Sequence, residues 1–302
     1  MPKVQNIIVS QAEAGQKLVQ FLERRLGRSV PRSAIMRWIR KGEVRVDKGR
    51  KKPFDRVDAG QTVRIPPFEP GNDSRAVAPA DAPALKISYH DDQLLAVAKP
   101  AGLAAHGGDG ITDSVAGRLR LMFPNAEFTP TLAHRLDRDT SGMLLVARTY
   151  DVLRELNDLF AAGKVGKLYL AWVQGRWDEP GVTLLEDRMQ KEGAPGRQKV
   201  RTGRGKTALA KVMGLVSGRH HSLVAVRLLT GRTHQIRVQL ASRNHPIAGD
   251  MKYGEHGRPP MRLHCYAIRL PERTLTLPPV WSGKWMVPPD ALREAIELLY
   301  EE

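Results

Sequence analysis

The 302-residue sequence has a single cysteine, Cys265, and no long uninterrupted apolar run. One cysteine excludes an intramolecular disulfide framework and any cysteine-rich zinc site. Because no stretch of about 18 apolar residues is present, no transmembrane helix is expected. The first residues, MPKVQNIIVS, lack the apolar core of a signal peptide. We therefore expect a cytoplasmic protein that does not bind a membrane.

Acidic residues are few compared with basic ones. The 32 Asp and Glu face 48 Lys and Arg, which gives a net charge of +16 and a pI of about 10.2. This imbalance is typical of proteins with a polyanionic partner. The excess is uneven, because residues 1–70 hold 16 basic and only 7 acidic side chains. Such an asymmetry indicates a separate, charge-binding domain at the N-terminus.

Two short segments near the N-terminus repeat apolar residues at helical spacing, which predicts two helices. Their apolar positions are Leu18, Phe21, Leu22 and Leu26, then Ile35, Trp38 and Ile39. Pro31 suits the first turn of the second helix, and Gly42 suits its end. Residues 42–50 alternate as a strand that turns at 47–49, and residues 61–65 predict another strand.

The polar faces of this region carry a large local excess of basic side chains. They are Arg32, Arg37, Arg40, Lys41 and Arg45. We interpret them as a nucleic-acid contact surface, with an ordinary solvated surface as the alternative. The segments AGQKLVQFLERRL, PRSAIMRWIRKGEVRVDKG and DAGQTVRIP resemble an S4-type RNA-binding domain over about residues 14–66. The resemblance implies a class of ligand and not a reaction.

The remaining chain is expected to form a second, larger domain. Residues 67–86 are rich in Pro, Ala, Asp and Ser and read as a linker. We therefore predict an S4-like domain at residues 1–66, a linker at 67–86 and a larger, catalytic domain at 87–302. Strand-like segments lie at 94–99, 143–148, 168–175 and 222–229, and helix-like segments lie at 151–161, 234–241 and 290–302. Their order predicts an α+β fold with a mostly antiparallel sheet.

The segment AHRLDRDTSGMLLVAR (133–148) has unusual chemistry. Asp137 lies between Arg135 and Arg138, and the turn formers Thr, Ser and Gly follow it before an apolar strand. Neighbouring guanidinium groups favour an ionised carboxylate, which can act as a nucleophile or a base. A salt-bridged turn that only orders the loop is the alternative.

Three further segments have weaker signals. LTGRTHQIRVQLASRNHPIAGDMKYG (229–254) gathers Arg232, His234, Arg237 and Arg243, which suit phosphates or carboxylates or form a basic surface. We expect no zinc at His234, because no further ligands have matching spacing. Tyr169 in an apolar strand is either core or a stacking platform for a base. The glycine loop 99–111 is no P-loop or Rossmann fingerprint, so no nucleotide cofactor is implied.

In their order along the chain, these segments resemble the RluA family of pseudouridine synthases over roughly residues 86–275. The shared signatures are KPAGLAAHGGDG, HRLDRDTSG, KLYLA, TGRTHQIRVQL with HPIAGDMKYG, and RLHCYAI. The HGGDG loop and the attached S4-like domain look most like the C-type branch, which modifies bacterial large-subunit rRNA at more than one uridine. Residues 185–206 are least like the family.

The resemblance implies roles for individual residues. Asp137 matches the essential aspartate, and Arg237 matches the arginine that pairs with it. Tyr169 matches the tyrosine that packs on the target base and is a candidate base for the C5 proton. Leu263 matches an apolar wall of the pocket. Arg135 is implied to contact RNA or support the loop, Lys167 to meet phosphate, Asp139 to be structural, and His134 to have no chemistry.

The implied reaction converts uridine to its C-glycoside isomer in large-subunit rRNA, free or within an assembly precursor. It adds no group, so no cofactor and no metal are expected. A synthase for tRNA or for another rRNA uridine, and a non-catalytic rRNA-binding assembly factor, remain as alternatives. A DNA-binding protein is disfavoured by the absence of a helix-turn-helix pattern. No heptad or interaction stripe stands out, so we expect a monomer.

Overall fold

The computed structural model describes residues 2–27, 30–69, 78–79, 81–108, 110–193, 199–254 and 260–300. Asp109 of the expected glycine loop, residues 70–77 and 80 of the expected linker, and the last two residues of the expected C-terminal helix lie outside the described residues. Within the described part of the chain, no helix is both long and apolar enough to cross a bilayer.

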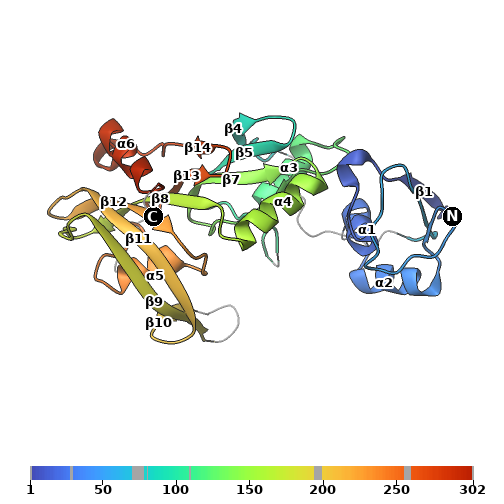
Figure 1. Cartoon of the computed structure of the whole chain (residues 1–302), viewed down its shortest axis with the longest axis horizontal. Helices are drawn as coiled ribbons and strands as arrows, with labels where there is room; N and C mark the ends of the chain where they lie inside the picture. Colours follow the sequence, from blue (N-terminus) through green and yellow to red (C-terminus); the bar gives the residue numbers. More distant parts are fainter. Residues whose placement is uncertain are drawn as a thin grey trace.

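A small unit at the N-terminus combines two helices with an antiparallel sheet in the order β1-β3-β2 (Figure 1). Its elements are β1 (Gln5–Ile8), η1 (Gln11–Glu13), α1 (Leu18–Leu26), α2 (Arg32–Lys41), β2 (Arg45–Val46) and β3 (Thr62–Ile65). Both predicted helices and the strand at 61–65 are confirmed. The seven apolar positions predicted from helical spacing are all buried in one cluster.

Three local details differ from the prediction or extend it. Pro31 lies at the N-cap of α2 with extended backbone, one residue before the first turn in which it was expected. The strand expected across 42–50 shortens to β2, because Asp47 and Lys48 adopt positive φ in the turn. Strand β1 was not predicted, since three of its four residues are exposed and give no apolar alternation. Gly42 ends α2 in the left-handed region, as expected.

The larger unit is built on a long mixed sheet with the order β10-β9-β11-β12-β8-β13-β7-β5-β4. Its strands are β4 (Lys86–His90), β5 (Leu94–Lys99), β6 (Thr131–Leu132), β7 (Ser141–Ala147), β8 (Gly166–Gln174), β9 (Val182–Glu192), β10 (Lys199–Thr202), β11 (Lys206–Val216), β12 (His221–Leu228), β13 (Leu263–Arg269) and β14 (Thr274–Thr276). Neighbours pair antiparallel except β13 with β7, which are parallel. The predicted α+β fold with a mostly antiparallel sheet is confirmed.

Helices α3 (Val115–Met122), α4 (Tyr150–Ala161), α5 (Gln235–Ala241) and α6 (Pro289–Glu297) pack around this sheet, and a 3-10 turn, η3 (Gly283–Trp285), precedes α6. The helical assignments at 151–161 and 234–241 are confirmed. The C-terminal helix ends earlier than predicted. Ala291 and Ala295 are buried in the cluster on one face of the sheet, and Leu292 and Ile296 are partly buried against it.

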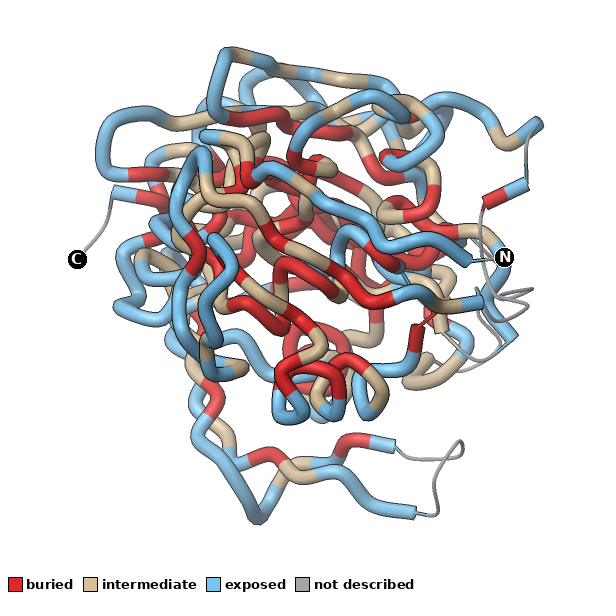
Figure 2. Tube along the Cα trace, turned by 90° about the vertical axis from the view of Figure 1, so that its right-hand side faces the viewer, coloured by how far each residue is buried: buried red, intermediate tan, exposed pale blue. Residues whose placement is uncertain are grey.

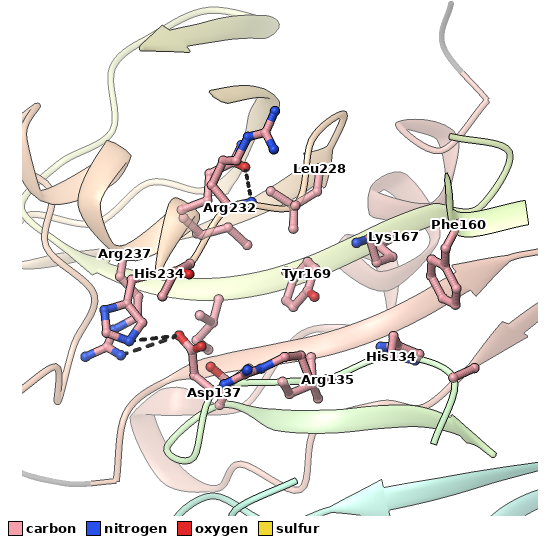
Figure 3. A pocket seen from close by; sticks show the side chains of 18 residues that line it. His134, Arg135, Asp137, Phe160, Lys167, Tyr169, Leu228, Arg232, His234 and Arg237 are labelled. Carbon is pink, nitrogen blue, oxygen red and sulfur yellow. Dashed lines mark hydrogen bonds and ion pairs between the residues drawn. The ribbon is translucent and has the colours of Figure 1, made fainter. Parts of the chain in front are cut away.

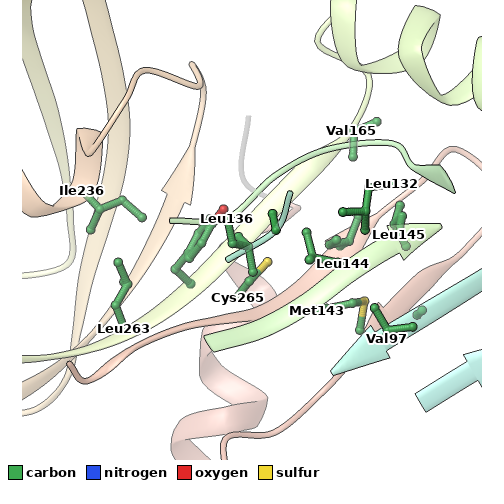
Figure 4. Close-up of a cluster of buried hydrophobic side chains, with 14 of the residues drawn as sticks. Val97, Leu132, Leu136, Met143, Leu144, Leu145, Val165, Ile236, Leu263 and Cys265 are labelled. Carbon is green, nitrogen blue, oxygen red and sulfur yellow. The ribbon is translucent and has the colours of Figure 1, made fainter. Parts of the chain in front are cut away.

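Alternate residues of β8 enter two different cores. Tyr169, Ala171 and Val173 belong to the cluster drawn in part in Figure 4, which also holds Met143, Leu144 and Leu145 of β7. Leu168, Leu170 and Trp172 point to the opposite face, where α6 covers them. Figure 2 shows the buried residues gathered inside the trace. The two-residue side-chain period of a strand therefore fixes which residues can reach the site.

The two units touch through α1. Arg24 donates from Nη1 to Thr131 Oγ1 at 2.8 Å and lies 4.6 Å from the centroid of the Phe128 ring. Ala12 of η1 also packs against the core of the larger unit. This contact orients the basic surface of the N-terminal unit relative to the larger one.

Candidate active site

Asp137 lies in the turn that precedes β7, and its side chain faces a cavity of about 440 Å³ (Figure 3). The carboxylate is 23% exposed, and the Thr140 N–H donates to the Asp137 carbonyl at 3.2 Å to close the turn. Gly142, at φ 122°, lets β7 approach β13, since a Cβ there would lie 2.4 Å from the Cys265 backbone nitrogen. The glycine of DTSG is thus required by a close backbone approach.

Lys99 fixes the same turn from the other side. Its ammonium group is buried and donates to the carbonyls of Pro100, Leu103 and Arg138 at 2.9, 2.7 and 2.7 Å. Burial lowers the pKa of Lys99 to about 8, although the nearby Asp139 and Asp137 carboxylates oppose the shift. The glycine-containing loop at 99–111 is therefore tied, through Lys99, to the turn that contains Asp137.

Arg237 of α5 lies beside Asp137, but its stronger partner is Asp250. Its Nε and Nη2 donate to the two Asp250 carboxylate oxygens at 2.7 Å each, while Nη1 is 3.5 Å from Asp137 Oδ2. Burial alone would raise the pKa of Asp250, but the guanidinium and two backbone N–H groups outweigh it and lower that pKa. Asp250 thereby holds the Arg237 guanidinium in place, and the remaining nitrogen, Nη1, lies toward Asp137.

His234 adds a second nitrogen near the carboxylate. Its Nε2 is 3.8 Å from Asp137 Oδ2, and its Nδ1 lies 2.7 Å from the Tyr253 hydroxyl oxygen. His234 has positive φ (54°) and directly precedes α5, so the chain turns sharply into the cavity there. Burial lowers the pKa of His234 despite the nearby Asp137 carboxylate. Burial therefore favours the neutral form of this imidazole.

Tyr169 and Leu263 form an apolar wall of the cavity. They are 6% and 3% exposed and come from the adjacent strands β8 and β13. Burial raises the pKa of Tyr169 well above its usual value, and its hydroxyl interacts with the Cys265 thiol. The ring thus meets the cavity as a neutral phenol.

The other predicted site residues divide into distinct environments. Arg135 is exposed and lines the cavity, and Lys167 lines its far end beside the Phe160 ring, 5.6 Å from the centroid. His134 accepts the Leu145 N–H at Nε2 (3.0 Å), and burial lowers its pKa to about 3, so it serves the fold. Asp139 pairs with Arg138 at 3.1 Å.

The basic side chains predicted to form an RNA-binding surface lie on the N-terminal unit, apart from the cavity. Arg37, Arg40 and Lys41 are exposed on α2, and Arg45 is half-buried on β2. Arg32 is exposed but forms an ion pair with Glu23 at 2.6 Å. The Glu23 carboxylate partly offsets the attraction of Arg32 for an anionic ligand. In the second signature, Arg243 pairs with Asp187 at 2.9 Å and does not line the cavity.

Sequence reasoning assigned no role to Asp250, Tyr253, Lys99 or Phe160. The first three lie in segments already singled out, GDMKYG and KPAG, so their position within a motif was the available signal. Among the described residues, no three His, Cys, Asp or Glu side chains come together in a way that could hold a metal ion.

Comparison with known proteins gives one consistent answer. Residues 93–242 match the family model described as RNA pseudouridylate synthase. The chain is 38% identical over 287 residues to the ribosomal large subunit pseudouridine synthase C of Haemophilus influenzae, covering 88% of this chain and 87% of that protein. It is 40% identical over 260 residues to the protein of the same name from Escherichia coli strain K12, covering 84% and 81%.

Solved structures agree. Human RNA pseudouridylate synthase domain containing 1 is 26% identical with a TM-score of 0.58, covering 78% of this chain and 98% of that one. Human RNA pseudouridylate synthase domain containing 4, at 23% identity and a TM-score of 0.54, shares the fold over 70% of this chain and 92% of that one. The fold, the matched signatures and these relatives together establish that the chain belongs to the RluA-type family of RNA pseudouridine synthases.

Proposed function

We propose that this protein isomerises uridines of bacterial large-subunit rRNA to pseudouridine, with Asp137 as the catalytic carboxylate. The observation that carries the proposal is the position of this side chain. It is partly exposed in a cavity of about 440 Å³, beside an arginine and opposite an aromatic ring. The proposal of an rRNA substrate rests on the names of the relatives. They are named ribosomal large subunit pseudouridine synthases, and they match most of this chain's length.

In this reaction the N1–C1′ bond breaks, the uracil turns, and a C5–C1′ bond forms. The proton on C5 leaves and N1 gains one, so the atoms balance without a cofactor. The target base has to leave its stack to reach Asp137, which costs a few kcal/mol and least in a loop or bulge. Contacts between basic side chains and phosphates offset this cost and make binding sensitive to salt.

Each side chain has a proposed task. The Asp137 carboxylate attacks the base, attacks C1′, or removes the C2′ proton, and every one of these routes needs its negative charge. Arg237 keeps that charge in place. The Tyr169 ring packs on the displaced uracil, where stacking contributes roughly 1–3 kcal/mol. In its deprotonated form, the phenol oxygen is the candidate acceptor for the C5 proton, and Leu263 completes the apolar wall.

The remaining proposed contacts position the RNA. Arg135 at the cavity mouth contacts RNA or supports the turn, and Lys167 meets a phosphate at its far end. The S4-like domain, proposed at residues 1–66, binds the RNA backbone through Arg32, Arg37, Arg40, Lys41 and Arg45. Backbone contacts orient a ligand without reading its sequence.

Tritium release from C5-labelled large-subunit rRNA tests the proposal, because the C5 proton is lost only on isomerisation. The wild-type protein should release tritium, and mapping the product should locate the uridine. Asp137→Asn should bind the RNA and release none. Asp139→Asn is the matched control, since Asp139 is in the same turn but pairs with Arg138. Turnover by Asp137→Asn, or wild-type release from tRNA but not rRNA, would contradict the proposal.

A further inference from the structure

A second cavity, of about 470 Å³, lies at the end of three neighbouring strands and adjoins the first. Here β12 ends at Leu228, β8 begins at Gly166, and β13 ends at Arg269, and these residues are paired or adjacent across the sheet. The two cavities share Phe160, Lys167, Leu228 and Gly231 in their walls. The two cavities therefore adjoin one another, with Lys167 in the wall of both.

The walls of this second cavity are strongly basic. They include Lys164, Lys167, Arg227 and Arg269, and no carboxylate is among the described residues that line it. Arg227 and Arg269 donate to the Leu298 and Leu299 carbonyls at 3.3 and 3.1 Å. The Leu299 carbonyl holds the Arg269 guanidinium in place but carries no formal charge, so it does not neutralise that group. Lys164 is exposed at the rim.

The spacing along β8 links the two cavities to one ligand. Lys167 and Tyr169 are two residues apart on the same face of the strand, which separates them by about 7 Å. This is comparable to the span of one nucleotide in an RNA strand. A uracil packed on Tyr169 would therefore place the backbone of a neighbouring nucleotide near Lys167, in the wall that the two cavities share.

We propose that the second cavity binds a phosphodiester of the RNA strand next to the target uridine, with Lys164 and Arg269 supplying the charge. The inference rests on the proposed function, since it assumes an RNA target in the catalytic cavity. Guanidinium and ammonium groups form strong, charge-assisted hydrogen bonds with phosphate oxygens. Such a contact holds the strand while the neighbouring base is displaced, and it carries no sequence information.

The test is a binding cycle between the protein and single phosphates of a synthetic stem-loop that contains the mapped uridine. Each phosphate within two nucleotides of that uridine is replaced in turn by an uncharged methylphosphonate. Lys164→Gln and Arg269→Gln are measured alone and together, with Arg269→Lys as a variant that retains the charge if the glutamine protein is unstable. Lys86→Gln is the matched control, because Lys86 is also exposed but lies on the edge strand β4, which β7 and β5 separate from β13.

One methylphosphonate should weaken wild-type binding by roughly three- to tenfold, and Lys164→Gln/Arg269→Gln should weaken binding to unmodified RNA by a similar factor. The same methylphosphonate should not change the RNA affinity of the double variant. The slope of its log affinity against log salt concentration should be smaller by roughly 0.7 per lost contact. Lys86→Gln should behave as wild type. In tritium release, Lys164→Gln should raise KM more than it lowers kcat.

Equal effects of every methylphosphonate on wild type and double variant would overturn the inference. Competition by inorganic phosphate at matched ionic strength, without any methylphosphonate effect, would show a site for free anions instead and would also overturn it. Failure of the wild type to release tritium from rRNA contradicts the proposed function separately, because the cycle measures binding and not turnover.

Discussion

Arg237 and Asp250 form a buried two-bonded ion pair, and this pair positions the arginine beside Asp137. The Asp250 side chain is fully buried and Arg237 is 6% exposed. Asp250 also accepts the N–H groups of Lys252 and Tyr253 at 2.8 and 3.1 Å. The Arg237 guanidinium is therefore held in a fixed position close to the Asp137 carboxylate.

Asp250→Asn should therefore damage both stability and turnover. Removing one charge of a buried pair leaves the other uncompensated, at a cost of about 3–5 kcal/mol in the free energy of unfolding. Arg237 would also lose its fixed position at Asp137, so tritium release should fall more than RNA binding. Denaturant unfolding and tritium release measure the two effects. Unchanged stability and turnover would refute the positioning role.

Tyr169→Phe should separate the ring from the hydroxyl. The ring remains, so RNA affinity should stay close to wild type, while loss of a proton acceptor lowers turnover by roughly 10²–10⁴-fold. Because burial raises the Tyr169 pKa well above 10, wild-type turnover should increase with pH above neutrality, and Phe should abolish this increase. Tyr169→Leu should lose affinity as well. A phenylalanine variant with wild-type turnover would exclude the hydroxyl from chemistry.

Lys99→Met should loosen the turn that carries Asp137. The substitution keeps an apolar stem of similar length but leaves the three carbonyls of Pro100, Leu103 and Arg138 without their donor. Each unsatisfied buried group costs about 1–3 kcal/mol, so unfolding should become easier and tritium release should fall. The exposed Lys86→Met is the control. Equal behaviour of the two variants would assign Lys99 no part in the site.

Stability should decline in acid because of His134. Its pKa is about 3 in the folded protein and 6.5 in the ordinary state, so between these values the unfolded chain binds the extra proton. The free energy of unfolding should then fall as pH drops from about 6.5 toward 3, by up to about 1.4 kcal/mol per pH unit for this group. His134→Gln should flatten the slope of stability against pH by one proton. An unchanged slope would contradict this origin.

Neutralising the α2 surface should weaken RNA binding without changing chemistry. Arg37→Gln, Arg40→Gln and Lys41→Gln are exposed substitutions, so folding should be preserved. Each lost phosphate contact should reduce the slope of log affinity against log salt by roughly 0.7–0.9. The turnover number at saturating RNA should stay near wild type. Full affinity of the triple variant at physiological salt would contradict the proposed S4-like role.

Local pattern was sufficient for most elements of the fold. The helical spacing of Leu18 to Ile39, the buried run at 94–99 and the turn chemistry after Asp137 are all short-range signals, and the structure confirms each of them. Strand β1 was not predicted, and the end of the C-terminal helix was placed too late. In those segments the neighbours across the sheet, and not the residues themselves, decide which side chains are buried.

The sequence by itself indicated the family and the basic N-terminal region, and it predicted Asp137, Tyr169 and Arg237 as site residues, because these follow from charge and from motifs within single segments. Only the tertiary structure showed that Asp250 holds Arg237 in place, that Lys99 ties two loops together, and that a basic cavity adjoins the first one at Lys167. Each of these depends on residues far apart in the chain meeting in space, and contacts of that kind are set by strand pairing and core packing.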